Sequence, residues 1–315
     1  MNQNERCALK PVHALPLRGS IFIVVLLISP AFSAQQEWQF TQHFFNLYDV
    51  NSAYAGNHGT TSIALRYRNQ WPGIAGAPKT QTLSLHSPLK KWPMGAGMRI
   101  MHESIGARSM ISLRVSGAYK MKLWGGNLSA GASLGAIREQ INLAELSIRD
   151  QDDLVPAIDN RSYTMPVAEV AVIFNTTRYW VGTEWTRLNR SKTQWASGGT
   201  ARMYYHGNTT AGVMIPAGKD DLIKLSGIVR YTEGGFWNYD IAAGFLLNNL
   251  IWFGSGYRAE SGPLFFTEVN INPKLRLGYS YETGNNQTYL PAQGHEIFLG
   301  FNPGNQQRSS IRFFQ

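Results

Sequence analysis

Two motifs in the sequence contain residue types that act in catalysis or metal binding in other proteins. The first, GASLG at residues 131–135, matches G-x-S-x-G, in which a hydrolase serine occupies a sharp turn between a strand and a helix. Apolar side chains recur at every second position from Leu128 to Leu134, and this alternation predicts a strand that runs straight through the motif. We therefore do not expect Ser133 to be a catalytic nucleophile.

The second motif is an acidic run in a stretch that we interpret as the longest loop. Its members are Asp150, Asp152, Asp153 and Asp159. Carboxylate oxygens are calcium ligands, but the run lacks the central glycine and the final glutamate of a calcium-binding loop. A solvated surface run is the preferred interpretation, and we predict no metal site and no cofactor.

Histidine is the remaining candidate for chemistry. Outside the N-terminal leader the histidines are His43, His58, His86, His102, His206 and His295. None of them belongs to an H-E-x-x-H motif or to a closely spaced ligand pair. Ser84 and His86 are two residues apart, which places them on one face of a strand, as is ordinary for polar residues inside a barrel. We therefore predict that the protein is not an enzyme, with a lipid-modifying barrel enzyme as the least favoured alternative.

The segments that position these residues show the period of two that is typical of strands. From Ile111 to Lys122, apolar side chains alternate with serine, alanine, arginine and lysine side chains. A cation in the middle of a bilayer costs about 2 to 4 kcal/mol, so the polar face must point into a lumen and the apolar face toward lipid. The same pattern recurs from Ser62 to Trp71 and from Lys274 to Glu282.

Taken along the chain, this pattern predicts about fourteen strands. They lie near residues 61–71, 80–86, 94–102, 108–122, 126–138, 163–174, 178–187, 200–214, 222–232, 236–247, 250–258, 263–271, 274–283 and 295–301. The predicted fold class is all-β, a single antiparallel transmembrane β-barrel of the outer-membrane type spanning residues 59–301. The 31 glycines and the 12% aromatic content agree with many tight turns and with aromatic girdles.

The lengths of the connections give an independent check on this prediction. Alternate connections are short and rich in turn-forming residues, at 125–127, 175–177, 248–249 and 272–273. The others include the long stretches 139–162, 188–199 and 284–294. Short turns at one end and long loops at the other are typical of outer-membrane barrels, whose short turns are periplasmic.

The two ends of the sequence do not continue the strand pattern. Residues 1–34 have basic residues before a short apolar run and small residues after it, which predicts a cleaved signal peptide. Cys7, the only cysteine, lies in this leader. Residues 35–58 are rich in aromatic side chains and are interpreted either as a periplasmic segment packed under the barrel or as a lumen plug. Residues 302–315 form a polar C-terminal tail, either an insertion signal or a periplasmic contact.

The net charge of +9 raises the question of nucleic-acid binding. The cations are scattered along strands and loops, and no helix-turn-helix, zinc-finger or RNA-binding pattern is present. We therefore predict no nucleic-acid partner and assign the basic residues to a polar lumen and to loops that face lipopolysaccharide.

Three linked motifs carry a resemblance to a known family. NSAYAG at residues 51–56, RYRNQW at 66–71 and GAPKTQT at 76–82 resemble the N-terminal signature of the PorP/SprF family. Ser52 stands where that family usually has proline, which removes a backbone restriction. The resemblance implies an outer-membrane accessory component of the type IX secretion system of the Bacteroidota, which helps to secrete or anchor cargo proteins, including cargo of gliding motility. The implied partners are secreted proteins with type IX C-terminal sorting domains, periplasmic or outer-membrane secretion components, the lipid bilayer and lipopolysaccharide.

The motif residues are the candidates for a fold-defining or partner-contacting core. They are Asn51, Tyr54, Ala55, Gly56, Arg68, Asn69, Gln70, Trp71, Pro78 and Thr80. The main alternative function is a passive outer-membrane diffusion channel, which needs a continuous wet lumen.

Overall fold

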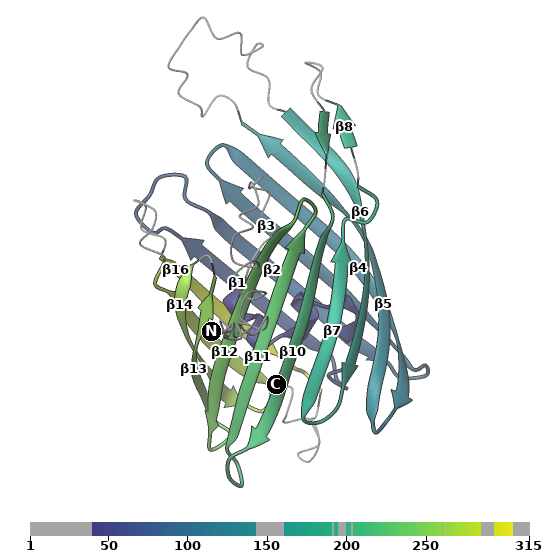
Figure 1. Ribbon diagram of the computed structural model, residues 1–315, viewed down its shortest axis with the longest axis vertical. Helices are drawn as coiled ribbons and strands as arrows, with labels where there is room; N and C mark the ends of the chain where they lie inside the picture. The colour runs from purple at the N-terminus through teal and green to yellow at the C-terminus, as the bar shows by residue number, and fades with distance from the viewer. Residues whose placement is uncertain are drawn as a thin grey trace, which may run out of the picture. The chain divides into compact units, whose positions relative to one another are not determined.

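A computed structural model of the chain describes residues 40–142, 161–190, 192–194, 200–202, 204–259, 261–284 and 293–304. Within these residues, fourteen antiparallel strands form a closed barrel (Figure 1). The strands are β1 (Ser62–Gln70), β2 (Lys79–Leu89), β3 (Met94–Ile105), β4 (Arg108–Leu123), β5 (Gly126–Ile141), β6 (Arg161–Asn175), β7 (Tyr179–Thr186), β10 (His206–Pro216), β11 (Leu222–Thr232), β12 (Phe236–Leu247), β13 (Ile251–Arg258), β14 (Gly262–Asn272), β15 (Leu275–Glu282) and β16 (Gly294–Phe301). The predicted all-β barrel is confirmed.

Each strand of the barrel pairs with the barrel strands before and after it in the sequence, and the barrel closes between its first and last strands. In that closing pair Ile63 lies opposite Phe301, and Gln70 lies opposite Gly294. Closure leaves no free sheet edge, so every strand finds hydrogen-bond partners within the barrel, as a bilayer requires.

One predicted strand begins later than expected. The sequence pattern placed a strand at 200–214, but β10 begins at His206, which lies opposite Thr186, the last residue of β7. Beyond that point β7 offers no partner. Thr200–Arg202 instead forms β9, which pairs with β8 (Lys192–Gln194) in a separate two-stranded sheet. These residues do form a strand, as their pattern predicts, but its pairing partner is β8 and not a strand of the barrel.

The two faces of the strands are chemically distinct, as the alternation predicts. On β4 the side chain of Val115 is 56% exposed on the outer surface, whereas Arg114 and Ser116 are buried on the luminal side. The G-x-S-x-G motif lies within β5, and Ser133 is buried on the luminal face of that strand. The serine therefore does not occupy a turn between a strand and a helix.

The connections differ at the two ends of the barrel. At the end where β4 meets β5, a tight turn places Trp124 and Gly125 at positive φ (47° and 75°), and β12 meets β13 through Asn248 and Asn249 (51° and 54°). We call this end the short-turn end and the opposite end the long-loop end. The four aspartates of the candidate calcium run (Asp150, Asp152, Asp153 and Asp159) belong to a long-loop connection, outside the described residues.

Residues 40–58, which we call the luminal segment, contact the inner faces of strands on several sides of the barrel (Figure 1). The segment contains three short 3-10 helices, η2 (Thr41–Phe44), η3 (Leu47–Asp49) and η4 (Ser52–Tyr54). In the part of the chain that the structure describes, no helix is long and apolar enough to cross a membrane.

Small luminal residues on the strands make room for this segment. A Cβ added to Gly131 on β5 would lie 2.6 Å from the Cα of Ala53, and one added to Gly95 on β3 would overlap the carbonyl group of Ala55. Glycine at these positions lets the two backbones approach each other closely.

Candidate functional site in the barrel lumen

The best-defined site in the molecule is the contact between the luminal segment and the barrel wall. Asn51 is fully buried, and its side-chain oxygen accepts a hydrogen bond from the backbone N–H of Ala53 at 3.0 Å, which caps η4. Its side-chain nitrogen donates to the carbonyl oxygens of Val172 on β6 and Thr183 on β7, both at 3.1 Å. One amide side chain therefore shapes the segment and also fixes it to two strands.

The rest of the 51–56 motif binds the wall through backbone groups. The backbone N–H of Ser52 donates to Glu184 at 2.9 Å. Gly56 has a φ of 70°, its N–H donates to Nδ1 of His86 at 3.1 Å, and its carbonyl accepts from Lys120 at 2.7 Å. A buried backbone group without a partner is costly, so these contacts favour one position of the segment.

Ser84 and His86, the alternative nucleophile and base, are both engaged by the luminal segment. The side chain of Asn46 donates to Oγ of Ser84 at 3.1 Å, and His86 accepts the Gly56 N–H. Both side chains therefore help to hold the luminal segment against the barrel wall.

An aromatic cluster anchors the other end of the segment. The ring centroid of Phe44 lies 4.5 Å from that of Phe266 on β14, 5.0 Å from that of Phe45 and 6.1 Å from that of Trp252 on β13. Nζ of Lys224 lies 4.5 Å from the centre of the Phe44 ring and donates to the backbone carbonyl of Phe44. Phe44 is 1% exposed, so the cluster removes a large apolar area from water.

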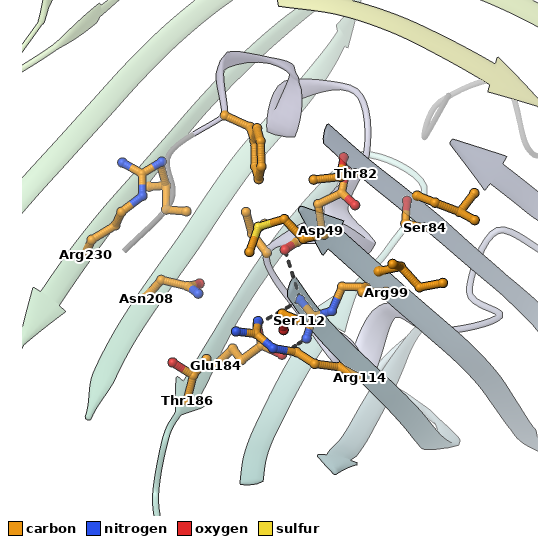
Figure 2. Close-up of a pocket in the computed structure, with 16 residues that line it drawn as sticks. Asp49, Thr82, Ser84, Arg99, Ser112, Arg114, Glu184, Thr186, Asn208 and Arg230 are labelled. Carbon is orange, nitrogen blue, oxygen red and sulfur yellow. Dashed lines mark hydrogen bonds and ion pairs between the residues drawn. The ribbon is translucent and has the colours of Figure 1, made fainter. Parts of the chain in front are cut away.

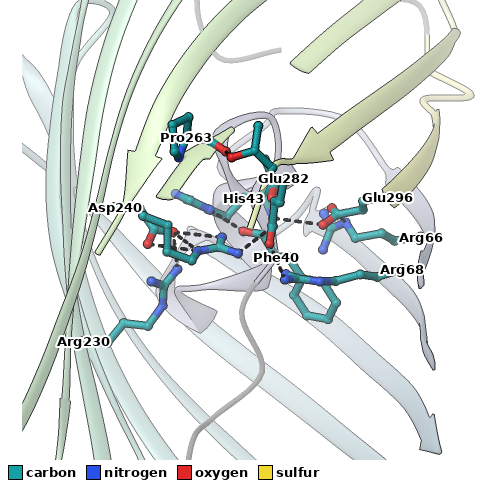
Figure 3. Close-up of polar contacts among 12 residues, drawn as sticks. Phe40, His43, Arg66, Arg68, Arg230, Asp240, Pro263, Glu282 and Glu296 are labelled. Atoms are coloured by element: carbon teal, nitrogen blue, oxygen red, sulfur yellow. Dashed lines mark hydrogen bonds and ion pairs between the residues drawn. The ribbon is translucent and has the colours of Figure 1, made fainter. Parts of the chain in front are cut away.

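Buried ion pairs surround this end of the segment (Figure 3). Glu282 lies between two groups of charges, accepting from Arg68 at 2.8 Å and from Arg258 at 2.6 Å. Asp240 binds Arg258 and Arg230, both at 3.0 Å. The luminal segment joins the network through Thr41, whose hydroxyl donates to Glu282 and whose N–H donates to Glu296 at 2.9 Å.

A second charged group lies around Asp49 (Figure 2). Asp49 binds Arg66 at 2.5 Å, and its backbone carbonyl accepts from Arg99 at 2.9 Å. Arg99 also binds Glu169 at 2.5 Å and Glu184 at 3.2 Å. Buried charges of this kind are stable only as pairs, because the removal of one partner leaves the other without compensation, at a cost of about 3 to 5 kcal/mol.

A cavity of about 80 Å³ lies beside Asp49. Arg99, Arg114 and Glu184 gather at one side of it, and Arg230 and Asn208 line another (Figure 2). A cavity of this size has room for a few water molecules. Within the described residues, no group of three or more acidic, histidine or cysteine side chains is arranged to hold a metal ion.

Burial favours the uncharged forms of His43, Tyr54 and His58 in the luminal segment. Burial, helped by Arg230 and opposed by Asp240, lowers the pKa of His43 to about 4. Burial, helped by Arg276, lowers the pKa of His58 to about 3, and burial raises the pKa of Tyr54. Burial of these side chains costs less in their uncharged forms, so the uncharged forms favour packing of the segment against the wall.

The sequence-predicted candidates separate into two groups in space. Asn51, Tyr54, Ala55, Gly56 and Arg68 all lie in the luminal contact region. Tyr54 is 3% exposed and its ring centroid lies 6.0 Å from that of His86.

The second group lies toward the long-loop end, at the connection between β1 and β2. Its members are Asn69, Gln70, Trp71, Pro78 and Thr80. The N–H of Gln70 donates to the carbonyl of Pro78 at 3.0 Å, and Trp71, with a φ of 52°, donates its N–H to Gln293 at 2.7 Å. Asn69 lies on the outward side of β1, whereas Thr80 is buried and donates to Glu103 at 3.5 Å. This group shapes a loop and does not touch the luminal segment in any described contact.

Several residues of the site were not among the predicted candidates. They are Phe44, Asp49, Arg66, Arg99, Glu184, Lys224, Asp240, Arg258, Glu282 and Glu296. All the strand residues in this set are charged and fall on the inward parity of their strands, so the alternation of polar and apolar residues contains a signal for them. Their pairing depends on which strands face each other across the lumen, which the alternation does not give.

Together these features define a β-barrel membrane protein with part of its own N-terminal region bound inside the lumen. The model of the type IX secretion system membrane protein family PorP/SprF matches residues 32–301. The chain therefore belongs to this family, as its motifs predicted. The barrel and the family together support localisation in the outer membrane.

Solved structures with a similar arrangement are outer-membrane barrels of low sequence identity. Omp33 of Acinetobacter baumannii is 10% identical, with 77% of this chain and 97% of that chain covered and a TM-score of 0.46. The toluene transporter TodX of P. putida is also 10% identical, with 85% of this chain and 95% of that chain covered and a TM-score of 0.45. The KdgM porin is 11% identical, with 76% of this chain and 98% of that chain covered and a TM-score of 0.39. No curated protein matches the sequence.

Proposed function

We propose that this protein is an outer-membrane accessory component of the type IX secretion system that helps to secrete or anchor particular cargo proteins at the cell surface. Membership of the PorP/SprF family supports this role. The observation that carries it is the luminal segment, because a barrel filled by its own chain is better suited to holding protein partners than to passing solutes.

In this proposal the luminal segment is a lumen plug. Aromatic packing around Phe44, the amide contacts of Asn51 and the ion pairs of Asp49 hold it from three sides of the wall. The motif residues 51–56 keep the plug in place, and the loop after Trp71 shapes the opposite end of the barrel. Residues 1–34 are removed as a signal peptide during export.

The proposed partners follow from the family. Secreted proteins with C-terminal sorting domains are the cargo, and periplasmic or outer-membrane secretion components are the machinery that delivers it. Cargo of gliding motility falls within this class. No catalytic step is assigned to the barrel.

Affinity purification tests this proposal directly. The tagged protein is extracted from outer membranes of its own host in mild detergent, and co-purifying proteins are quantified by mass spectrometry against a tagged porin prepared in parallel. Stoichiometric recovery of proteins with C-terminal sorting domains, or of secretion components, is expected. Recovery of the barrel alone, together with conductance of the intact protein in planar bilayers, would favour a diffusion channel instead.

A further inference from the structure

A pocket of about 600 Å³ opens at the short-turn end of the barrel, away from the ion pairs described above. Its walls come from the end of the luminal segment at Asn57 and His58, from the turn between β4 and β5, and from the turn between β6 and β7. The two turns are neighbours, because Asn127 on β5 lies opposite Asn175 on β6. Since the luminal segment forms one wall, the pocket faces the inside of the strand ring and not the surrounding lipid.

Two buried polar atoms in the pocket wall have no hydrogen-bond partner among the described residues. They are Oδ1 of Asn175 and Nε2 of His58, and each side chain belongs to a residue that is 5% exposed. The other ring nitrogen of His58 is engaged with the Thr60 hydroxyl at 3.1 Å. A buried polar atom without a partner costs about 1 to 3 kcal/mol, so these two atoms can gain a contact from a ligand that enters the pocket.

The pocket also contains a cation that makes no ion pair with any described residue. Lys122 shares the inward parity of Lys120, but whereas Lys120 donates to Gly56, Lys122 is exposed. Two residues further, Trp124 is 85% exposed on a turn held at positive φ. Lys122 and Trp124 both line the pocket, and a cation together with an exposed indole favours a carboxylate-bearing partner with apolar surface.

We propose that this pocket binds an acidic, extended peptide segment of a partner protein presented at the short-turn end. Lys122 pairs with a carboxylate of the peptide, Asn175 accepts one of its N–H groups, and the indole of Trp124 packs against its side chains. Because lipid lies outside the strand ring, a peptide reaches the pocket more readily than a lipid headgroup does. This inference goes beyond the proposed function, since it assigns a docking site that is independent of the identity of the cargo.

Fluorescence anisotropy with the purified full-length barrel in nanodiscs tests the inference. The probe is a short fluorescein-labelled peptide with glutamate at alternate positions, and its control is the same peptide with glutamine in place of glutamate. Saturable binding of the glutamate peptide is expected. We expect Lys122→Glu to weaken it by about tenfold or more, since a favourable charge pair becomes a repulsive one.

Lys219→Glu is the matched control variant, because Lys219 is exposed on the turn between β10 and β11 and does not line the pocket. It should change the affinity by less than about twofold if binding is local. Thr177→Glu, at an exposed position of the pocket, should weaken binding as Lys122→Glu does without altering a buried contact. Equal losses for Lys122→Glu and Lys219→Glu, equal binding of both peptides, or no saturable binding would each overturn the inference.

Discussion

Replacement of Phe44 by alanine should release the luminal segment from the barrel wall. The ring is 1% exposed and packs against Phe45, Trp252 and Phe266, with the Lys224 ammonium over its face. Truncation of a buried phenylalanine costs about 3 to 5 kcal/mol, part of which comes from the cavity that remains. At 1.4 kcal/mol for each factor of ten, a loss of about 3 kcal/mol increases the released fraction roughly 100-fold.

Cysteine labelling measures this fraction directly. The side chain of Ser52 is fully buried in the luminal segment, so a Ser52→Cys variant in a Cys7→Ser background reacts with a maleimide reagent only when the segment is released. Phe265→Ala is the matched control, since Phe265 is the residue before Phe266 on β14 and is 51% exposed on the outer surface. The labelling rate should rise by about two orders of magnitude in Phe44→Ala and remain unchanged in Phe265→Ala. Equal rates in Phe44→Ala and in the parent protein would refute the anchoring role of the aromatic cluster.

Three further predictions concern the same contact. Gly131→Ala should displace the luminal segment, because the added Cβ would lie 2.6 Å from Ala53. Gly117→Ala is its control and should have no effect, because nothing lies within 4 Å of its added Cβ. The labelling assay compares the two variants. Asn51→Ala removes the cap of η4 and two hydrogen bonds to the wall, so it should weaken attachment by about 2 kcal/mol, seen as an increase in labelling of roughly 30-fold. Acidification should also release the segment. The pKa of His43 falls from 6.5 to about 4 on burial, so the contribution of His43 to attachment is complete above pH 6.5 and weakens as the pH falls toward 4, by about 2 kcal/mol at pH 5; His58, whose pKa is lowered to about 3, acts in the same direction. Channel opening in planar bilayers should therefore increase from pH 7 to pH 5, and His43→Gln should reduce that increase. If His43→Gln leaves the increase unchanged, the pH response belongs to other titratable groups.

The strand pattern was predictable from the sequence because a bilayer imposes a strict rule on it. A luminal cation such as Arg114 must alternate with a lipid-facing residue such as Val115, so the parity of each strand is visible along the chain. The start of β10 was not predictable in this way. It depends on where β7 ends at Thr186, which is a property of the partner strand.

The candidate site was predictable only in part. Asn51 and Arg68 belong to motifs that lie close together in the sequence, so the sequence alone identifies them as candidates. Arg68 binds Glu282, 214 residues further along the chain. That pairing exists because β1 closes against β16, which lies next to β15, and it requires the strand number and register as well as the alternation.

The secreted proteome of a strain without the gene tests the central proposal most directly. Secreted and surface-bound proteins are quantified in the deletion strain, in the parent strain and in a strain complemented with the intact gene, and uptake of small polar solutes is measured in all three. The account predicts that particular proteins with C-terminal sorting domains are lost from the cell surface, that complementation restores them, and that solute uptake does not change. An unaltered set of secreted proteins together with reduced solute uptake would contradict it and identify the barrel as a diffusion channel.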